Sequence, residues 1–263
     1  MAGSIIWFQP KAAEFYHLVV PKRASGVVDE KFVEKYIKNQ KEVKVVSLGI
    51  GTGRELSWLD KLKNVKEIIG VDYSPAMLKI CKDVAKKCKI KITLVRDNLL
   101  RLKKFKRIIK NEKLPLIYIC LINTLGNFKE KDREKVLRNV RNLMKAKDRL
   151  ILCLYKRPER IKITLKILPA LKIKTALRGQ IALALEYYYN EVLWSGIYKK
   201  FYQIPQFIYD RKTNDVAVFC KKRKIFISHR FSKEEIEELA KIAKLKIEKL
   251  IEGKFMYVVI LKI

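Results

Sequence analysis

Three glycines lie close together where an apolar segment meets an amphipathic one, in the sequence Val45-Val46-Ser47-Leu48-Gly49-Ile50-Gly51-Thr52-Gly53. Glycine lets the backbone turn sharply and approach a ligand closely. A tight turn between a strand and a helix explains one glycine at such a place, but not three. Gly49, Gly51 and Gly53 therefore indicate a loop that binds a ligand.

The spacing of these glycines distinguishes between two kinds of nucleotide ligand. A dinucleotide fingerprint, GxGxxG, places a pyrophosphate on the N-terminus of the following helix. That fingerprint needs a glycine at position 54, where this chain has Arg54. The observed spacing is GxGxG, so the sequence predicts that the loop does not bind NAD.

A carboxylate follows the next apolar segment. Asp72 comes directly after Glu67–Val71, one helix and one strand beyond the glycine loop. A carboxylate at the end of the second strand of an α/β sheet can accept hydrogen bonds from both hydroxyls of a ribose. The alternative is a helix cap, but the nearby glycine loop favours the ligand. Tyr73 is predicted either to pack on an adenine ring or to join the core.

Polar side chains also follow the third and fourth apolar segments. Asp97 and Asn98 come after Ile90–Val95. Asp97 can accept a hydrogen bond from the exocyclic amine of an adenine. The alternative is that the pair only opens a turn. Asn123 follows Leu114–Ile122. Ligands bind at the carboxyl ends of the strands in open α/β sheets, so Asn98 and Asn123 are further candidates for cofactor binding.

The elements that must position these residues alternate between short apolar strands and amphipathic helices. Alternation of this kind predicts an α/β fold with a doubly wound, mostly parallel sheet. The predicted strands are Val43–Leu48, Glu67–Val71, Ile90–Val95, Leu114–Ile122, Arg149–Tyr155, Lys246–Ile251 and Phe255–Leu261. The predicted helices are Asp29–Asn39, Arg54–Leu62, Ser74–Lys87, Lys131–Lys145 and Ser232–Ala243. The last two strands are joined through Glu252 and Gly253, a turn so short that the seven-stranded sheet must close with an antiparallel strand.

The alternation stops after the fifth strand and resumes at Ser232. We therefore predict three segments: N-terminal helices and a cofactor-binding core at 1–155, a cap insertion at 156–231, and a closing helix and hairpin at 232–263. The insertion is rich in aromatic residues, and we expect it to contain a helix and antiparallel strands. A cap over the carboxyl ends of the strands would exclude water from a reaction there.

Taken together, these features resemble the class I (Rossmann-like) S-adenosylmethionine-dependent methyltransferases. The resemblance spans about residues 43–155 and 232–263. It implies that Gly49, Gly51 and Gly53 contact the methionine part of the cofactor, Asp72 the ribose and Asp97 the adenine. The cofactor would be S-adenosyl-L-methionine, with no metal.

The chain departs from this family at two places. The family usually has an acidic residue two positions before the first glycine, where this chain has Ser47, so the contact to the methionine amino group is left open. The turn before the fifth strand usually reads Gly-Gly and is Lys147-Asp148 here.

The acceptor is predicted from weaker signals. The stretch Asn123-Thr124-Leu125-Gly126 lacks the Asp/Asn-Pro-Pro-aromatic motif of many enzymes that methylate base amino groups. This favours transfer to a nitrogen or oxygen of a small molecule under the cap. His229 and Tyr16 are candidate catalytic residues, with a structural role as the alternative. A cofactor-binding module without activity is a third possibility.

Composition keeps an RNA acceptor open and predicts a cytoplasmic protein. Lys and Arg number 59 against 27 Asp and Glu, a formal net charge of +32 that would attract polyanions such as tRNA or rRNA. A lysine-rich, glycine-poor composition bias explains the same charge without RNA. The five cysteines form no CxxC pair, as expected of reduced thiols. No apolar run approaches the ~18 residues that span a bilayer, so no membrane association is expected.

Overall fold

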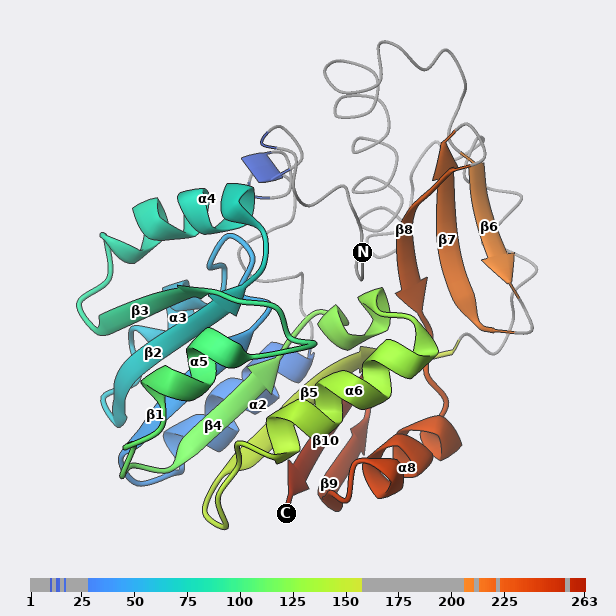
Figure 1. The fold of residues 1–263 in the computed structure, drawn as a ribbon. Coiled ribbons are helices and arrows are strands. Elements are labelled where there is room, and N and C mark those ends of the chain that lie inside the picture. The colour runs from blue at the N-terminus through green and yellow to red at the C-terminus, as the bar shows by residue number, and fades with distance from the viewer. Residues whose placement is uncertain are drawn as a thin grey trace.

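The computed structural model describes residues 28–157, 206–210, 213–220, 223–253 and 256–263, together with Pro10, Ala13, Glu14 and His17 (Figure 1). Tyr16, and the helix expected within the insertion, lie outside these described residues. The division of the chain into three segments therefore stays a prediction.

Seven strands form one main sheet in the order β3-β2-β1-β4-β5-β10-β9. Their bounds are β1 Val43–Leu48, β2 Val65–Asp72, β3 Lys91–Arg96, β4 Leu116–Cys120, β5 Arg149–Tyr155, β9 Lys246–Glu252 and β10 Met256–Lys262. Strands β1 to β5 pair in parallel, whereas β10 is antiparallel to both of its neighbours. The predicted fold class is therefore confirmed, including the antiparallel closing strand.

The strand order reverses between β1 and β4. The chain moves outward from β1 through β2 to β3, then crosses back to place β4 on the other side of β1. Such a reversal leaves a crevice at the carboxyl ends of the two strands, where open α/β sheets bind their ligands. The glycine loop follows β1, so it lies at this point.

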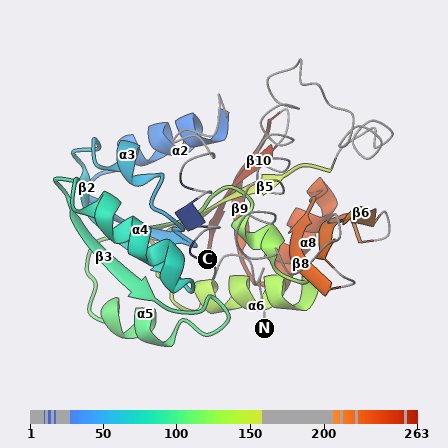
Figure 2. The same ribbon diagram turned by 90° about the horizontal axis from the view of Figure 1, so that it is seen from above.

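Helices cover both faces of the main sheet. Those with bounds in the structure are α2 Val28–Lys38, α3 Leu56–Leu59, α4 Pro75–Ala85, α5 Lys103–Ile108, α6 Glu130–Arg141 and α8 Lys233–Ile242, with a 3-10 helix η2 at Thr124–Asn127. Side chains of α2, α3 and α4 pack in one apolar cluster, and those of α5, α6 and α8 in another. Figure 2 shows α2 and α3 on one side of the strands and α5 and α6 on the other. All five β4 residues are buried because both faces are covered.

Side-chain caps determine where two of the helices begin. Ser74 accepts a hydrogen bond from the Met77 backbone N–H (3.1 Å), and Pro75 occupies the first turn of α4. Ser232 and Glu235 form a capping box at the start of α8, as the Ser-x-x-Glu pattern predicts. These caps fix where each helix leaves its loop.

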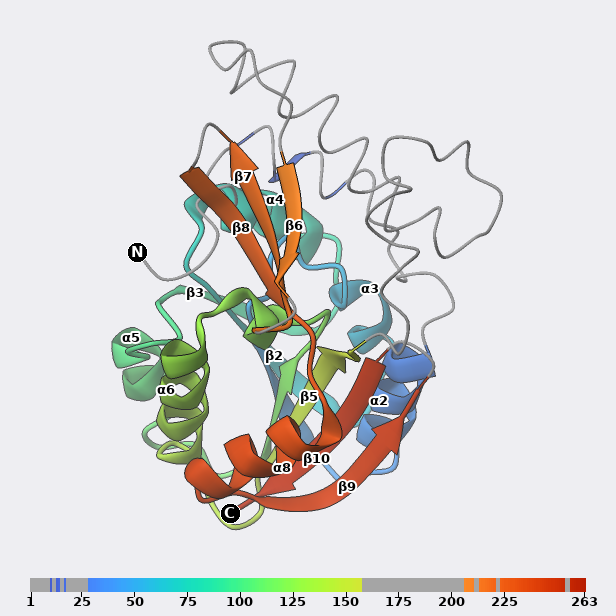
Figure 3. The ribbon, with the colours of Figure 1, turned by 90° about the vertical axis from the view of Figure 1, so that its right-hand side faces the viewer.

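Three strands of the insertion form a second, antiparallel sheet in the order β6-β7-β8, with bounds β6 Gln206–Asp210, β7 Asp215–Cys220 and β8 Arg223–His229. Backbone hydrogen bonds connect it to the end of β5: Arg157 donates to Phe231 O, and Phe231 donates to Tyr155 O, each at 2.8 Å. Figure 3 shows this sheet beyond the edge of the main sheet, away from α8 and β9.

Several boundaries differ from expectation. The helix predicted at Arg54–Leu62 is regular only over Leu56–Leu59, and the one predicted at Lys131–Lys145 runs from Glu130 to Arg141. Helix α5 was not predicted, because a single residue, Phe105, is its only buried side chain. In the described part of the chain no helix has the length and hydropathy to cross a bilayer.

Candidate functional site

The glycine loop has the backbone conformation that its sequence predicts. Gly49, Gly51 and Gly53 have φ values of +78°, +56° and +78°, a region that favours glycine. A Cβ atom at Gly49 would stand 2.5 Å from Cγ2 of Thr124, in the turn after β4. The loop thus passes between the ends of β1 and β4 with no room for a side chain.

Asp72 ends β2 and holds the glycine loop. Its Oδ2 accepts a hydrogen bond from the Gly51 N–H and its Oδ1 accepts one from the Ser74 N–H, both at 2.8 Å. Burial raises the pKa of Asp72 above its ordinary value, although these backbone donors act against the shift. A carboxylate offers about four acceptor sites, so each oxygen retains capacity for a ligand hydroxyl. The next side chain, Tyr73, is 43% exposed beside the loop.

Asp97 and Asn98 lie beside Asp72 but are used within the chain. The Asp97 N–H donates to the Asp72 carbonyl at 3.0 Å. Asp97 Oδ2 accepts from the Lys104 and Phe105 N–H groups at 2.7 and 3.0 Å and so holds the start of α5. Its Oδ1 accepts from the Asn98 N–H. The turn expected as the alternative reading is therefore present, and adenine binding by these residues stays a prediction.

Asn123 joins three strands at the carboxyl edge. Its Nδ2 donates to Ser228 Oγ and to the His229 carbonyl, each at 3.0 Å, and its Oδ1 accepts from the Tyr155 N–H at 2.9 Å. Asn123 and its neighbour Ile122 have φ values of +57° and +48°. Asn123 is 1% exposed and connects the ends of β4, β5 and β8, and its contact with the cofactor stays a prediction.

His229 lies in a buried cluster of charged side chains. Its Nδ1 is 2.7 Å from Asp215 Oδ1, and its Nε2 is 3.5 Å from Glu235 Oε1. Arg133 Nη2 lies 3.1 Å from the same Asp215 oxygen, and His229 is only 3% exposed. Both ring nitrogens thus face carboxylates, which anchor β8 to α6 and α8. The role of His229 as a base stays a prediction.

The sequence reading missed one acidic residue of this site. Glu55, directly after the loop, is 7% exposed and accepts a hydrogen bond from the hydroxyl of Ser47 on β1. Burial raises the pKa of Glu55, although the Ser47 bond and the charge of Arg54 oppose the shift. The available signal was an acid just past the third glycine in a chain that lacks one at position 47.

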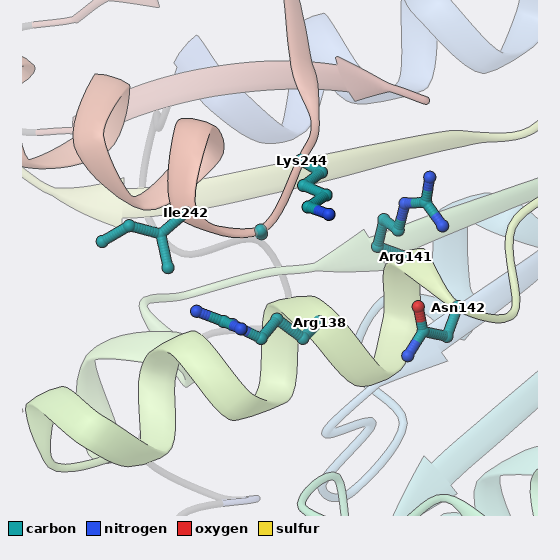
Figure 4. Close-up of a pocket in the computed structure, with 6 residues that line it drawn as sticks. Arg138, Arg141, Asn142, Ile242 and Lys244 are labelled. Carbon is teal, nitrogen blue, oxygen red and sulfur yellow. The ribbon is translucent and has the colours of Figure 1, made fainter.

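A hollow lies at the end of the main sheet away from the glycine loop. It has a volume of about 270 Å³ between the C-terminal ends of α6 and α8, and Figure 4 shows Arg138, Arg141 and Lys244 around it. Cations at helix C-termini are favoured by the helix dipole, which explains these side chains without a ligand. Within the described residues no group of three or more His, Cys, Asp or Glu side chains is arranged to hold a metal.

Comparisons with known proteins agree with this geometry. The family model described as a methyltransferase domain matches residues 45–147, from β1 to the turn before β5. No curated protein sequence matches the chain.

Solved structures show the fold over almost the whole chain. An S-adenosylmethionine-dependent methyltransferase from Clostridium acetobutylicum is 16% identical with a TM-score of 0.57, covering 95% of this chain and 98% of that one. The CcbJ methyltransferase from Streptomyces caelestis is 13% identical with a TM-score of 0.60, covering 98% and 97%. The 1,6-didemethyltoxoflavin-N1-methyltransferase from Burkholderia thailandensis, solved with 1,6-didemethyltoxoflavin and S-adenosylhomocysteine, is 9% identical with a TM-score of 0.55, covering 96% and 87%.

The fold, the loop and the family match define the class. Residues 45–147 match a methyltransferase domain, the fold is that of the class I, Rossmann-like methyltransferases, and the cofactor that both indicate is S-adenosyl-L-methionine. The site contains groups that fit this cofactor: Asp72 can receive ribose hydroxyls, and the buried Thr52 Oγ1 within the glycine loop has no hydrogen-bond partner among the described residues.

Proposed function

We propose that this methyltransferase transfers the methyl group to a nitrogen or oxygen atom of a small molecule, enclosed between the carboxyl edge of the main sheet and the insertion. One observation carries the proposal. The Asn123 side chain bonds to Ser228 and His229, so β8 of the insertion is joined to the end of β4. The next residue, Thr124, packs against Gly49 of the loop. The end of β8 therefore lies beside the turn that packs against the cofactor loop, which supports a cap over the site.

The residues of this chain serve mainly to position the reactants. When bound, S-adenosyl-L-methionine supplies a methyl group on a positively charged sulfur, a good leaving group. Asp72 and the glycine loop hold the cofactor, and Tyr73 flanks it. Alignment of an acceptor atom with the methyl group then provides much of the rate, because the reaction becomes effectively unimolecular. His229, enclosed by Asp215 and Glu235, has a positioning role for β8 in this proposal.

Two further facts bear on the acceptor. The Burkholderia thailandensis enzyme of the same fold is named for its action on 1,6-didemethyltoxoflavin, a small molecule. The formal net charge of +32 instead favours RNA, which is the second candidate acceptor. The cytoplasmic location, expected because the cysteines form no CxxC pair, is part of the proposal; Cys81, Cys88 and Cys120 are free thiols in the structure.

Transfer of a labelled methyl group tests this proposal. The protein is incubated with methyl-labelled cofactor and a cell extract separated by ultrafiltration, with and without ribonuclease treatment. We expect label in the low-molecular-mass filtrate, unaffected by ribonuclease. Label in a retained, ribonuclease-sensitive fraction would identify RNA as the acceptor. Tight binding of S-adenosylhomocysteine without label in any fraction would identify a non-catalytic binding module.

A further inference from the structure

The base of the glycine loop contains a buried pair formed by a hydroxyl and a carboxylate. Ser47 is the fifth residue of β1 and is 2% exposed. Its hydroxyl donates to Oε1 of Glu55, the residue that precedes α3. The bond therefore crosses beneath the loop, from the strand that enters it to the helix that leaves it.

A second carboxylate faces the same small region. The charge of Asp72 raises the pKa of Glu55, in addition to the effect of burial. Burial, together with the charges of Glu55 and Asp72, also raises the pKa of the Cys81 thiol on α4. The Cys81 sulfur lies 2.8 Å from where a Cβ atom of Gly53 would stand. The Asp72 carboxylate is thus bonded to Gly51, the Glu55 carboxylate to Ser47 at the base of the loop, and the Cys81 thiol lies against Gly53.

Two carboxylates in one buried region favour a positively charged occupant. The charge of Asp72 makes Glu55 harder to ionise and burial disfavours the charge of both acids, and an added cation relieves these effects. Asp72 receives its hydrogen bonds from backbone N–H groups, and Arg54 is the cation next to Glu55. The cofactor brings a primary ammonium group, at the end of its amino-acid part.

We propose that Glu55, held in place by the Ser47 hydroxyl, binds the ammonium group of the cofactor. This rests on the cofactor assignment and not on the nature of the acceptor. Glu55 would then supply the acid that binds the amino group. At the position where the family usually has this acid, the chain has Ser47. Ser47 then acts as a positioning residue, because it orients the carboxylate without touching the ligand.

A pair of ligands separates this role from a structural one. S-Adenosylhomocysteine carries the ammonium group, whereas 5′-methylthioadenosine retains the adenosine and lacks the whole amino-acid part. We expect Glu55→Gln to weaken the binding of S-adenosylhomocysteine by about tenfold to a hundredfold, as for loss of one charge-assisted hydrogen bond. We expect calorimetry to show unchanged affinity for 5′-methylthioadenosine. Equal weakening of both ligands, or of neither, would overturn the proposal.

Glu67 provides a matched control. It is also a buried glutamate, 6% exposed, and it accepts a hydroxyl hydrogen bond from Thr93 at 2.6 Å. Its other partners are Lys44 and Lys91, at the amino-terminal ends of β1 and β3 and so at the end of the sheet away from the loop. Glu67→Gln is expected to lower thermal stability and to leave the ratio of the two affinities unchanged.

A variant with the carboxylate moved to position 47 tests whether an acid there restores binding of the ammonium group. In the double variant Ser47→Asp, Glu55→Gln the carboxylate moves to β1, at the other end of the same hydrogen bond. We expect this variant to recover preference for S-adenosylhomocysteine over 5′-methylthioadenosine relative to Glu55→Gln alone. No recovery in a folded double variant contradicts the assignment. The labelling experiment is independent of this outcome, since it identifies the acceptor and not the residue that binds the ammonium group.

Discussion

At the scale of single residues, the Asp72 carboxylate stabilises the loop through hydrogen bonds, whereas the burial of its charge costs free energy. Its carboxylate holds the glycine loop through the Gly51 N–H and the start of α4 through the Ser74 N–H. Burial nevertheless raises its pKa, which means that the folded chain disfavours the charge. A buried acid with a raised pKa, bonded to a glycine loop at the end of a strand, is a candidate for ligand binding.

Replacement of Asp72 by asparagine is expected to separate these effects. The variant loses the charge and keeps only one of the two acceptor oxygens, so its amide NH2 faces one of the two backbone donors and the free energy of unfolding of the ligand-free protein should fall by about 1–3 kcal/mol. The affinity for S-adenosylhomocysteine should fall by roughly 1.5–3 kcal/mol, the contribution of a hydrogen bond to a charged group. Calorimetry and urea unfolding measure the two quantities.

Asp60 serves as the control for this prediction. It also accepts hydrogen bonds from two backbone N–H groups, those of Lys89 and Ile90, at 2.8 and 2.9 Å, but it lies at the end of α3 away from the loop. Asp60→Asn should leave cofactor affinity unchanged. If Asp72→Asn behaves in the same way, Asp72 is only a cap.

At the scale of elements, strands were predicted better than helices. The bounds of β1 and β5 agree with the apolar runs Val43–Leu48 and Arg149–Tyr155, because strands covered on both faces are apolar at nearly every position. Helix α5 has the sequence KKFKRI and buries only Phe105. Its start depends on the Asp97 carboxylate, a contact that no periodicity reveals.

For the site, too, the positions of residues were easier to predict than their contacts. The positions of Gly49, Asp72 and Asn123 at successive strand ends follow from the alternation of elements, and the sequence predicts them. Their partners do not follow from it. Asn123 bonds to residues more than a hundred positions later, and the Ser47 bond to Glu55 depends on how α3 folds back under the loop.

The junction between β8 and the main body should be sensitive to acid. Burial by itself raises the pKa of Asp215, but the bond with His229 and the charge of Arg133 outweigh it and bring the pKa below its ordinary value. An acid with a lowered pKa adds stability above its unfolded pKa and loses it as the pH falls through the folded one. Urea unfolding should therefore show a loss of stability below about pH 4 that is smaller in Asp215→Asn.

At neutral pH, Asp215→Asn should itself be destabilising. It leaves Arg133, with a side chain 6% exposed, without its carboxylate, which corresponds to a loss on the order of 3 kcal/mol. The exposed pair Lys86–Asp83 is the control, since Asp83→Asn removes only a solvent-screened ion pair and should change stability much less. An unchanged acid profile in Asp215→Asn would falsify the role of this cluster.

At the scale of the whole molecule, the charge of +32 should act on polyanions and not on the cofactor. Binding of bulk tRNA should weaken by about tenfold or more between 50 and 200 mM salt, because it releases counterions. Binding of S-adenosylhomocysteine, which has no net charge, should hardly change over that range. Fluorescence anisotropy for tRNA and calorimetry for the small ligand measure the two dependences. Tight tRNA binding that persists at high salt would shift the proposed acceptor to RNA.

The antiparallel strand β10 has a consequence for how the chain is made. It lies between β5 and β9, so β9 reaches the main sheet only through a strand that comes later in the sequence. On the ribosome, β5 therefore presents an unpaired edge while residues 156–255 are still being added. Pairing over so long a separation is slow, and open edges invite association between nascent chains. Closure of the sheet by residues 256–262 thus ends the period in which this protein is most exposed to misassembly.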